Sequence, residues 1–273
     1  MSHAYLSIDV EDYYHLEYYK EKNRNTDYSM LDGLELFLDL CETESIPPNL
    51  FVLSDVVKPA KAQIERAIKM GGKIGLHGLD HKRPLTLSLK KFRKDTIKAK
   101  QIIEDTLGYE LNGYRAACFS LNREYLDSLI NMGFSFDSSY INFQTHPLYG
   151  YIDLDGFTDN QNGIFENKNF REYEMTLPKI FKKNLPVTGG AYFRILPYAL
   201  VEALTKQIFN ENKIVNFYTH PFELSSKSFP INNEMTLKDT FRSSYKKGDA
   251  TLRRMKKFIK LVKDQGYKFS IYE

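Results

Sequence analysis

The sequence predicts an α/β protein whose mainly parallel sheet is closed, or nearly closed, into a distorted barrel. Short apolar segments alternate along the chain with longer segments of helical periodicity, which indicates successive βα units. The candidate chemical residues directly follow the strand segments, and in such folds the carboxyl ends of the strands carry the active site. No internal repeat, low-complexity tract or linker interrupts this pattern. Residues 1–273 are therefore expected to form one domain.

The expected strands are short apolar runs bounded by turn residues. They cover residues 5–10, 50–53, 73–76, 113–115, 134–137, 214–219 and 267–272. The first expected helix, over 31–44, has Leu34, Leu38 and Cys41 on one face and is stopped by Pro47. The other expected helices cover 56–70, 88–107, 122–132, 197–210 and 251–265. Residues 140–190 are rich in Asn, Asp and Gly, and are expected to form an elaborated loop region with short strands.

The composition excludes several classes of protein. The hydrophobic content of 42% suits a large core, while the net charge of +3 is too weak to argue for nucleic-acid binding. Cys41 and Cys118 are too few for a disulfide framework. No window reaches the roughly 20 apolar residues of a membrane span. The N-terminal residues resemble no signal peptide, so a reduced, cytoplasmic protein is expected.

One pair of histidines stands near an acidic cluster in the predicted fold. His77 and His81 are four residues apart, a spacing that on a helical turn puts both imidazoles on one face, close enough to bind one ion. The cluster of Asp9, Glu11 and Asp12 ends the first strand and offers a third ligand. Two histidines and one carboxylate leave a coordination position for water, which is typical of a catalytic zinc site. Cobalt, nickel and manganese also bind such ligands.

Five segments at the predicted strand ends carry most of the polar motifs. They read Ser-Ile-Asp-Val-Glu-Asp (7–12), His-Gly-Leu-Asp-His (77–81), Gly-Tyr-Arg-Ala-Ala-Cys-Phe (113–119), Phe-Asp-Ser-Ser (136–139) and Thr-His-Pro-Phe-Glu (219–223). In order and spacing they resemble the five motifs of the polysaccharide deacetylase family with NodB homology. Two further segments, 146–150 and 189–197, resemble the branch of that family found with exopolysaccharide export and surface-glycan clusters.

The resemblance covers nearly the whole chain and implies both a fold and an activity. The implied fold is a distorted (β/α) barrel of the NodB type. The implied activity is metal-dependent removal of an N-acetyl, or other small N-acyl, group from an amino sugar of a glycan or glycan precursor. The metal, most often zinc, would polarise the amide carbonyl and lower the pKa of a bound water to roughly 7.

Roles for four polar residues follow from the same resemblance. Asp9 corresponds to the general base, and Arg115 to the arginine that holds it by a charge-assisted hydrogen bond. His220 corresponds to the general acid that protonates the departing amine. Asp137 corresponds to the carboxylate that orients or tunes this histidine.

The third metal ligand is left open between two acidic residues. Glu11 shares one face of an extended strand with Asp9. Asp12 has the residue type that is usual for the ligand in the family. Both are therefore kept as candidate ligands with His77 and His81.

The chain departs from the family pattern near the expected substrate pocket. Ala117 stands where proline is common and Cys118 where an aromatic residue is common, although the backbone N–H at the latter position still helps to stabilise the oxyanion in the family. Phe222 replaces a frequent tryptophan. The residues expected to contact substrate are Cys118, Phe119, His146, Tyr192, Arg194 and Phe222.

Two other functions are compatible with the resemblance: hydrolysis of a different C–N bond, as in allantoinase-like relatives, and non-catalytic glycan binding by the same fold. The basic run over 246–263 is interpreted as the solvated face of an amphipathic outer helix, with weak attraction to an anionic membrane surface as the alternative. The expected partner is an N-acetylated saccharide or glycan precursor, with no nucleic acid.

Overall fold

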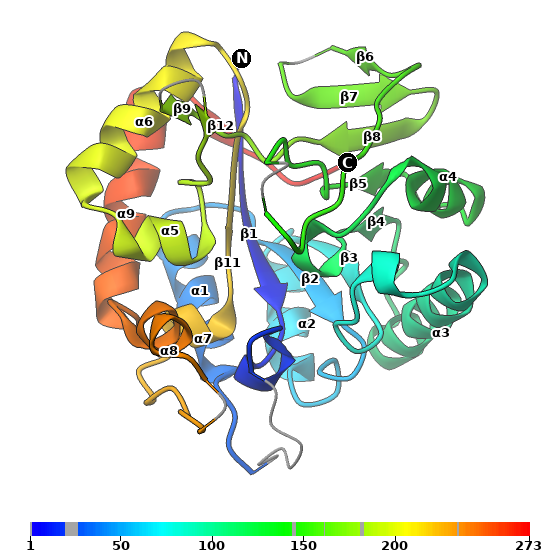
Figure 1. The fold of residues 1–273 in the computed structure, drawn as a ribbon, viewed down its shortest axis with the longest axis horizontal. Coiled ribbons are helices and arrows are strands. Elements are labelled where there is room, and N and C mark those ends of the chain that lie inside the picture. The colour runs from blue at the N-terminus through cyan, green and yellow to red at the C-terminus, as the bar shows by residue number, and fades with distance from the viewer. Residues whose placement is uncertain (1, 20–26, 144–145, 161, 181–182, 234) are drawn as a thin grey trace.

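The computed structural model describes residues 2–19, 27–143, 146–160, 162–180, 183–233 and 235–273 (Figure 1). Its strands are β1 (His3–Val10), β2 (Asn49–Leu53), β3 (Lys73–Gly78), β4 (Gly113–Tyr114), β5 (Phe136–Asp137), β6 (Thr158–Asp159), β7 (Ile164–Asn167), β8 (Phe170–Tyr173), β9 (Lys179–Ile180), β10 (Lys183–Asn184), β11 (Val215–Thr219) and β12 (Lys268–Phe269). Its α-helices are α1 (Asp32–Thr43), α2 (Lys61–Lys69), α3 (Leu89–Leu107), α4 (Arg123–Asn131), α5 (Gly190–Ile195), α6 (Tyr198–Asn210), α7 (Pro221–Leu224), α8 (Leu237–Ser244) and α9 (Asp249–Asp264). Short 3-10 helices cover Tyr13–His15, Pro84–Thr86 and Ala117–Phe119.

A curled sheet forms the centre of the molecule. Its strand order is β11-β1-β2-β3-β4-β5-β8-β7-β6, and β12 pairs with the start of β1. Every pair from β11 to β8 is parallel, whereas β8, β7 and β6 form an antiparallel extension. The α/β class with mainly parallel strands is therefore confirmed. In the described residues the path of strands ends at β11 and β6, so the sheet is an open half-barrel.

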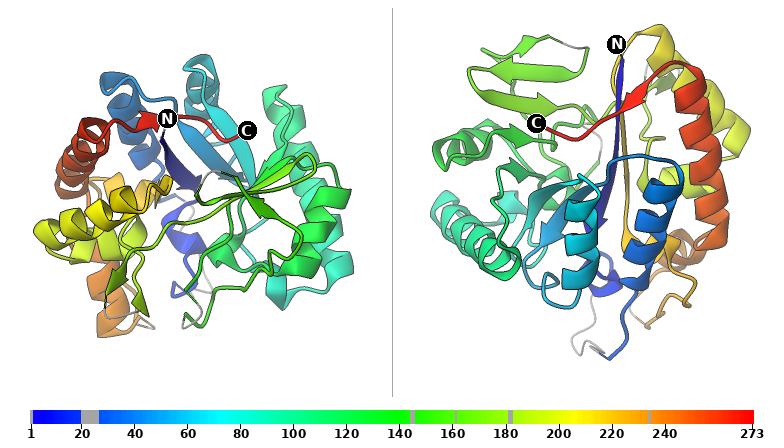
Figure 2. Two further views of the ribbon diagram at one scale, coloured as in Figure 1. Left: turned by 90° about the horizontal axis from the view of Figure 1, so that it is seen from above. Right: turned by 180° about the vertical axis from the view of Figure 1, so that it is seen from behind.

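Helices pack on the outer side of this sheet (Figure 2). The first helix forms because its apolar residues recur every three or four positions: Leu34, Leu38 and Cys41 of α1 are all buried, as the sequence predicts. In α9 the residues Met255 and Ile259 are buried and the basic side chains face outward, which agrees with a solvated basic face. No helix within the described ranges is long and apolar enough to cross a membrane.

Aromatic side chains fill the inside of the half-barrel beneath the strand ends. Tyr5 stacks on Tyr272 with ring centroids 4.8 Å apart, and Phe136 stacks on the same ring at 5.6 Å. The Tyr272 hydroxyl donates to Asn216 Oδ1 at 2.6 Å. The C-terminal segment therefore closes the inner core and supplies a polar atom below the cleft.

Several element boundaries differ from the sequence-based prediction. Helix α2 begins at Lys61 rather than at residue 56, because Pro59 disfavours helical backbone at the residue before it. The last strand is limited to Lys268–Phe269. The sequence analysis missed α5, α7 and α8, which are short. The strands of the antiparallel extension lie in the region expected to form loops with short strands, which confirms that expectation.

Candidate metal centre and cleft

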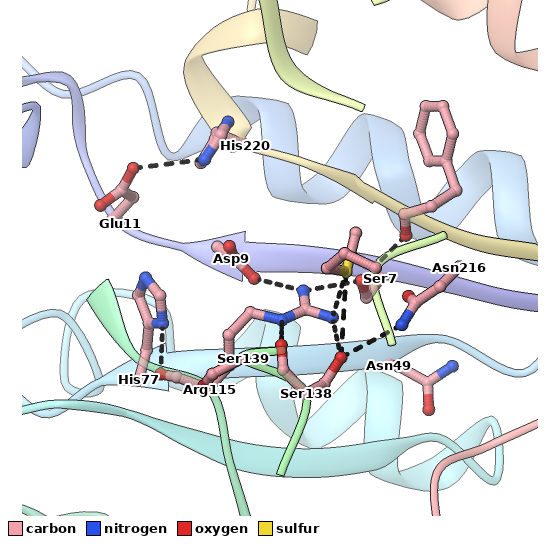
Figure 3. Close-up of polar contacts among 12 residues, drawn as sticks. Ser7, Asp9, Glu11, Asn49, His77, Arg115, Ser138, Ser139, Asn216 and His220 are labelled. Atoms are coloured by element: carbon pink, nitrogen blue, oxygen red, sulfur yellow. Dashed lines mark hydrogen bonds and ion pairs between the residues drawn. The ribbon is translucent and has the colours of Figure 1, made fainter. Parts of the chain in front are cut away.

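Polar side chains gather where neighbouring parallel strands end (Figure 3). Asp9 lies near the end of β1, His77 near the end of β3, and Arg115 and His220 directly follow β4 and β11. Because the carboxyl ends of parallel strands meet at one edge of a sheet, these distant residues come together beside one cleft. The cleft has a volume of about 100 Å³; Asp9, Glu11, His77 and His220 line it, while Arg115 is fully buried and binds Asp9.

Three of these side chains form a group that can hold a metal ion. Potential ligand atoms of Glu11, His77 and His81 all lie within 4.8 Å of one another, and all three residues are buried. Glu11 Oε2 lies 2.7 Å from His81 Nε2, yet it has no hydrogen-bond partner, and His81 Nδ1 also has none. A buried carboxylate oxygen without a donor beside imidazole nitrogens fits a bound cation.

The hydrogen bond of His77 leaves its other nitrogen available for this cation. His77 Nδ1 lies 2.9 Å from the Arg115 carbonyl oxygen, which can only accept, so Nδ1 carries the hydrogen and Nε2 keeps its lone pair. Burial lowers the pKa of His77 to about 4, so the ring is neutral at pH 7. The pKa of Glu11 lies well below its ordinary value: burial acts to raise it, but the nearby His81 outweighs that effect. The donor set is therefore a neutral imidazole, a second imidazole and a carboxylate.

The spacing of the two histidines suggested that they share a helical turn, but in the structure they do not. His77 belongs to β3, Gly78 has φ +119°, and His81 has φ +59° in the bend that follows. Gly78 allows this backbone, since a φ of that value is strained for any residue with a Cβ. The chain folds back after the strand and returns His81 toward His77, with ring centroids 5.3 Å apart.

The structure brings Glu11, not Asp12, beside the histidines. Asp12 Oδ1 accepts hydrogen bonds from the backbone N–H groups of Tyr13 at 2.8 Å and Met30 at 2.9 Å. The Asp12 carboxylate therefore caps the 3-10 helix that follows and fastens the chain before α1. The expectation that Asp12 is a ligand does not fit this geometry.

Asp9 is held by a buried arginine, in the manner that the resemblance implies. Arg115 Nη1 donates to Asp9 Oδ1 and to Ser7 Oγ, both at 2.8 Å. Its remaining donors bind Ser138 and Tyr272, and its guanidinium lies 4.0 Å from the centre of the Phe51 ring. Asp9 Oδ2 has no protein partner in the described part of the chain and borders the cleft. The fully engaged arginine thus orients one oxygen of Asp9 and leaves the other available.

A second buried ion pair stands on the opposite side of the cleft, behind His220. Glu223 Oε2 lies 3.0 Å from His220 Nδ1, and Glu223 Oε1 accepts from Arg194 Nε at 2.6 Å. His220 Nε2 is 3.6 Å from Glu11 Oε1. Burial opposes protonation of this imidazole, but Glu223 outweighs it and raises the pKa of His220 to about 9. The imidazolium therefore presents an acidic N–H to the cleft.

The carboxylate that orients His220 is consequently Glu223, and the role expected for Asp137 is wrong. Asp137 accepts from the backbone N–H and the hydroxyl of Ser139 at 2.9 and 2.8 Å, and it pairs in register with Glu172 of β8. The fifth sequence motif contains Glu223, but the sequence analysis assigned this residue no role. The signal was its position three residues after His220 at the start of α7, where a side chain reaches back to the first residue.

The segment after Arg115 presents a backbone donor to the cleft. Cys118 and Phe119 both have positive φ, 54° and 51°, which turns the backbone after β4 toward the ligand group. In the described residues the Cys118 N–H has no protein acceptor, and Cys118 lines the cleft. Burial raises the pKa of its thiol, so the side chain stays neutral. The position suits an oxyanion-binding N–H rather than a nucleophile.

The other residues expected to contact substrate divide into two groups. His146 and Phe119 line the cleft, and Tyr192 lines a groove outside it. Phe222 also borders the cleft, and its largely buried ring stacks on the imidazole of His220 at 5.5 Å. Arg194 borders the cleft as well, and its buried guanidinium binds Glu223, so it positions the acid.

The glycine pair before α5 shapes another wall of the cleft. A Cβ on Gly189 would lie 2.4 Å from the Tyr218 ring and from its carbonyl oxygen, and Gly190 has φ +55°. Tyr218 is itself buried and packs edge-on against Phe119 at 5.1 Å. Only residues without a side chain allow α5 to approach this strand so closely.

Comparison with known proteins agrees with this architecture. The polysaccharide deacetylase family model matches residues 27–136, and a domain of unknown function (DUF3473) matches residues 138–269. A peptidoglycan deacetylase from Helicobacter pylori is 23% identical over 117 residues, which are 43% of this chain and 40% of that protein. Residues 27–136 of the chain match the polysaccharide deacetylase family.

Solved structures share the fold of this chain. A family 4 carbohydrate esterase from Streptomyces lividans, in complex with acetate, has a TM-score of 0.54 at 8% identity, over 100% of this chain and 93% of that one. A CE4 family pseudoenzyme from Bacillus anthracis has a TM-score of 0.53 at 12% identity, over 98% and 63%. Because an esterase and a pseudoenzyme share the fold, the fold alone does not decide activity.

The family match leaves some expectations as predictions. The first motif, with Asp9 and Glu11, and the fifth, with His220, lie outside the residues matched by the deacetylase model. Their roles therefore depend on the geometry of the cleft. The glycan-cluster branch and the single domain over 1–273 also stay predictions.

Proposed function

We propose that this protein is a metal-dependent hydrolase of the polysaccharide deacetylase family, which removes an N-acetyl, or another small N-acyl, group from an amino sugar of a glycan or glycan precursor. The observation that carries the proposal is the Glu11, His77 and His81 group, which lies between Asp9 on one side and His220 on the other. The cleft thus combines cation ligands, a base and an acid.

Glu11, His77 and His81 would hold a divalent ion, with zinc favoured and cobalt, nickel or manganese compatible with the same ligands. Such an ion polarises an acyl carbonyl and lowers the pKa of water.

The residues of the chain itself account for the proton transfers. Asp9 Oδ2 accepts a proton from the attacking water, while Arg115 keeps the carboxylate in place. The Cys118 N–H donates to the carbonyl oxygen as negative charge develops there. His220 gives its Nε2 proton to the nitrogen of the amino sugar as the C–N bond breaks, so that a free amine and a carboxylate leave.

Elemental analysis of matched variants tests the metal centre. Glu11→Gln and Asp12→Asn each remove one negative charge, from adjacent residues. We expect zinc-loaded Asp12→Asn protein to retain stoichiometric metal, and Glu11→Gln protein to lose at least tenfold in metal affinity, because only Glu11 faces the histidines. A wild-type protein that binds no divalent ion under any loading condition would refute the metal centre.

Release of acetate from N-acetylated sugars, nucleotide sugars and glycan oligomers tests the reaction. We expect turnover by the zinc-loaded protein and a loss of at least about 100-fold in Asp9→Asn, whose amide cannot accept the proton. Undiminished activity in this variant would contradict the assigned base. A metal-loaded protein that releases nothing from any substrate would instead indicate non-catalytic glycan binding.

We also propose where the protein acts: in the cytoplasm, with weak association of the basic face of α9 with an anionic membrane surface. Vesicle co-sedimentation with and without anionic lipid tests the membrane association.

A further inference from the structure

The metal-binding cleft continues outward into a larger groove that the proposed reaction does not use. The two share Glu17, Tyr18, His146 and Arg242 in their walls, so they are continuous. The groove has a volume of about 900 Å³, and α5 and α8 form one side of it. A single N-acyl amino sugar occupies only a small part of such a space, so the groove has room for a further part of a substrate.

Arg242 differs from the other arginines of this region in its partners. Arg115 and Arg194 form buried ion pairs, and Arg83 pairs with Glu17 at 3.0 Å. The Arg242 guanidinium has no carboxylate partner in the described residues, and it lies 5.1 Å from the centre of the Tyr18 ring. Stacking on an aromatic face orients a guanidinium and leaves its N–H fork free to bind in its own plane.

The backbone at Arg242 is fastened independently of its side chain. Arg194 Nη2 donates to the Arg242 carbonyl oxygen at 2.7 Å, and Arg194 Nη1 donates to that of Tyr245 at the same distance. The end of α8 is thereby fixed to the buried pair that supports His220. The backbone of Arg242 is therefore held at a constant place relative to the acid.

The surroundings of Arg242 are positively charged. Burial first, and then the positive charges of Arg242 and Lys238, lower the pKa of His146 to about 4. The two acidic side chains of the groove are already engaged, Glu17 by Arg83 and Asp239 by the Thr236 hydroxyl at 2.6 Å. The groove thus favours a ligand that carries negative charge.

We propose that Arg242 binds an oxyanion of the substrate, a carboxylate or a phosphate group, and that the preferred substrate is therefore an acidic N-acyl amino sugar. This inference rests on the proposed deacylation. Two or three N–H groups of a guanidinium match two oxygens of either anion in a bidentate pair. The rings of Tyr18 and Tyr192 in the same groove offer faces for the saccharide.

Kinetics with three sugars test the inference: N-acetylglucosamine (neutral), N-acetylglucosamine 1-phosphate and N-acetylmuramic acid (a carboxylate). We expect the wild type to prefer at least one acidic sugar by tenfold or more in kcat/KM. Arg242→Gln is expected to reduce this preference at least tenfold, chiefly through KM, and Arg242→Lys to restore part of it. The acidic sugar whose preference depends on Arg242 identifies the anion. Arg253→Gln, an exposed arginine of α9, is the charge-matched control and should keep the wild-type preference.

Calorimetric titration of the same acidic sugars separates this inference from the proposed reaction, since binding needs no turnover. Binding that Arg242→Gln weakens at least tenfold, without acetate release, would keep the anion site and reject the deacylation. Acetate release with equal losses on neutral and acidic sugars in Arg242→Gln would keep the deacylation and reject the anion site. A wild type that neither prefers nor binds the acidic sugars would also reject the anion site.

Discussion

The protein is expected to lose stability as the pH rises from about 5 to about 8. Replacing Glu172 by glutamine is expected to prevent part of this loss. Glu172 of β8 and Asp137 of β5 are register partners, and both are buried. Glu172 Oε1 accepts from the backbone N–H groups of Ser139 at 3.0 Å and Tyr140 at 2.8 Å, whereas Oε2 is buried without a partner. A glutamine keeps the accepting oxygen and removes the second negative charge.

The size of the effect follows from the pKa values of the pair. Burial raises the pKa of Asp137 from 3.8 to about 6, and burial together with the charge of Asp137 raises the pKa of Glu172 well above its ordinary value. A carboxyl group with a higher pKa in the folded state stabilises the fold fully below its unfolded pKa, and this contribution is lost as the pH rises through the folded value. The contribution of Asp137, which comes from its own burial, remains in the variant, so the difference between the two proteins reports Glu172.

Urea unfolding between pH 5 and pH 8 measures this difference. We expect the free energy of unfolding to fall less between pH 5 and pH 8 in Glu172→Gln than in the wild type, because the glutamine removes the contribution of Glu172 while those of the other titrating groups cancel; each pKa unit by which Glu172 is raised on folding corresponds to about 1.4 kcal/mol. Glu166→Gln on β7, whose carboxylate pairs with Arg171 at 2.8 Å near the surface, is the matched control and should follow the wild type. Parallel curves for Glu172→Gln and the wild type would refute the reasoning.

Three further changes test the support of the cleft. Gly189→Ala should lower the free energy of unfolding by about 2–4 kcal/mol, because its Cβ would lie 2.4 Å from Tyr218; a urea midpoint like that of the wild type would contradict this contact. Arg194→Met should cost about 3–5 kcal/mol in urea unfolding, since it leaves the Glu223 carboxylate buried without its cation, and a loss below about 1 kcal/mol would show that the pair is dispensable. Cys118→Ala should change kcat for acyl release by less than about threefold, because the backbone N–H remains; a loss of 100-fold would assign the chemistry to the thiol.

Much of the fold was predictable because local patterns and tertiary packing agree. The apolar run of β1 and the periodicity of α1 each have one structural solution that buries their side chains. The short helices α5 and α7 were not predictable in this way. They are stabilised by contacts with distant segments, such as the approach of Gly189 to Tyr218, that leave no local period.

The site was predictable in part, and the wrong predictions about it share one physical cause. Asp9 and Arg115 meet as the resemblance implies, and His77 and His81 lie together. Spacing suggested a helical turn for the histidines, but the positive φ of Gly78 sets a different return path. Spacing along the chain does not record which way the backbone turns after a strand.

The sequence by itself determined the α/β class, the strand ends and the types of polar residue that gather there, because side-chain period and burial are local properties. The tertiary structure decided which acid serves which neighbour. Glu11 faces the histidines while Asp12 caps a turn, and Glu223 rather than Asp137 binds His220. Adjacent or equivalent carboxylates differ only in direction, and direction depends on backbone torsions and on partners brought together from distant parts of the chain.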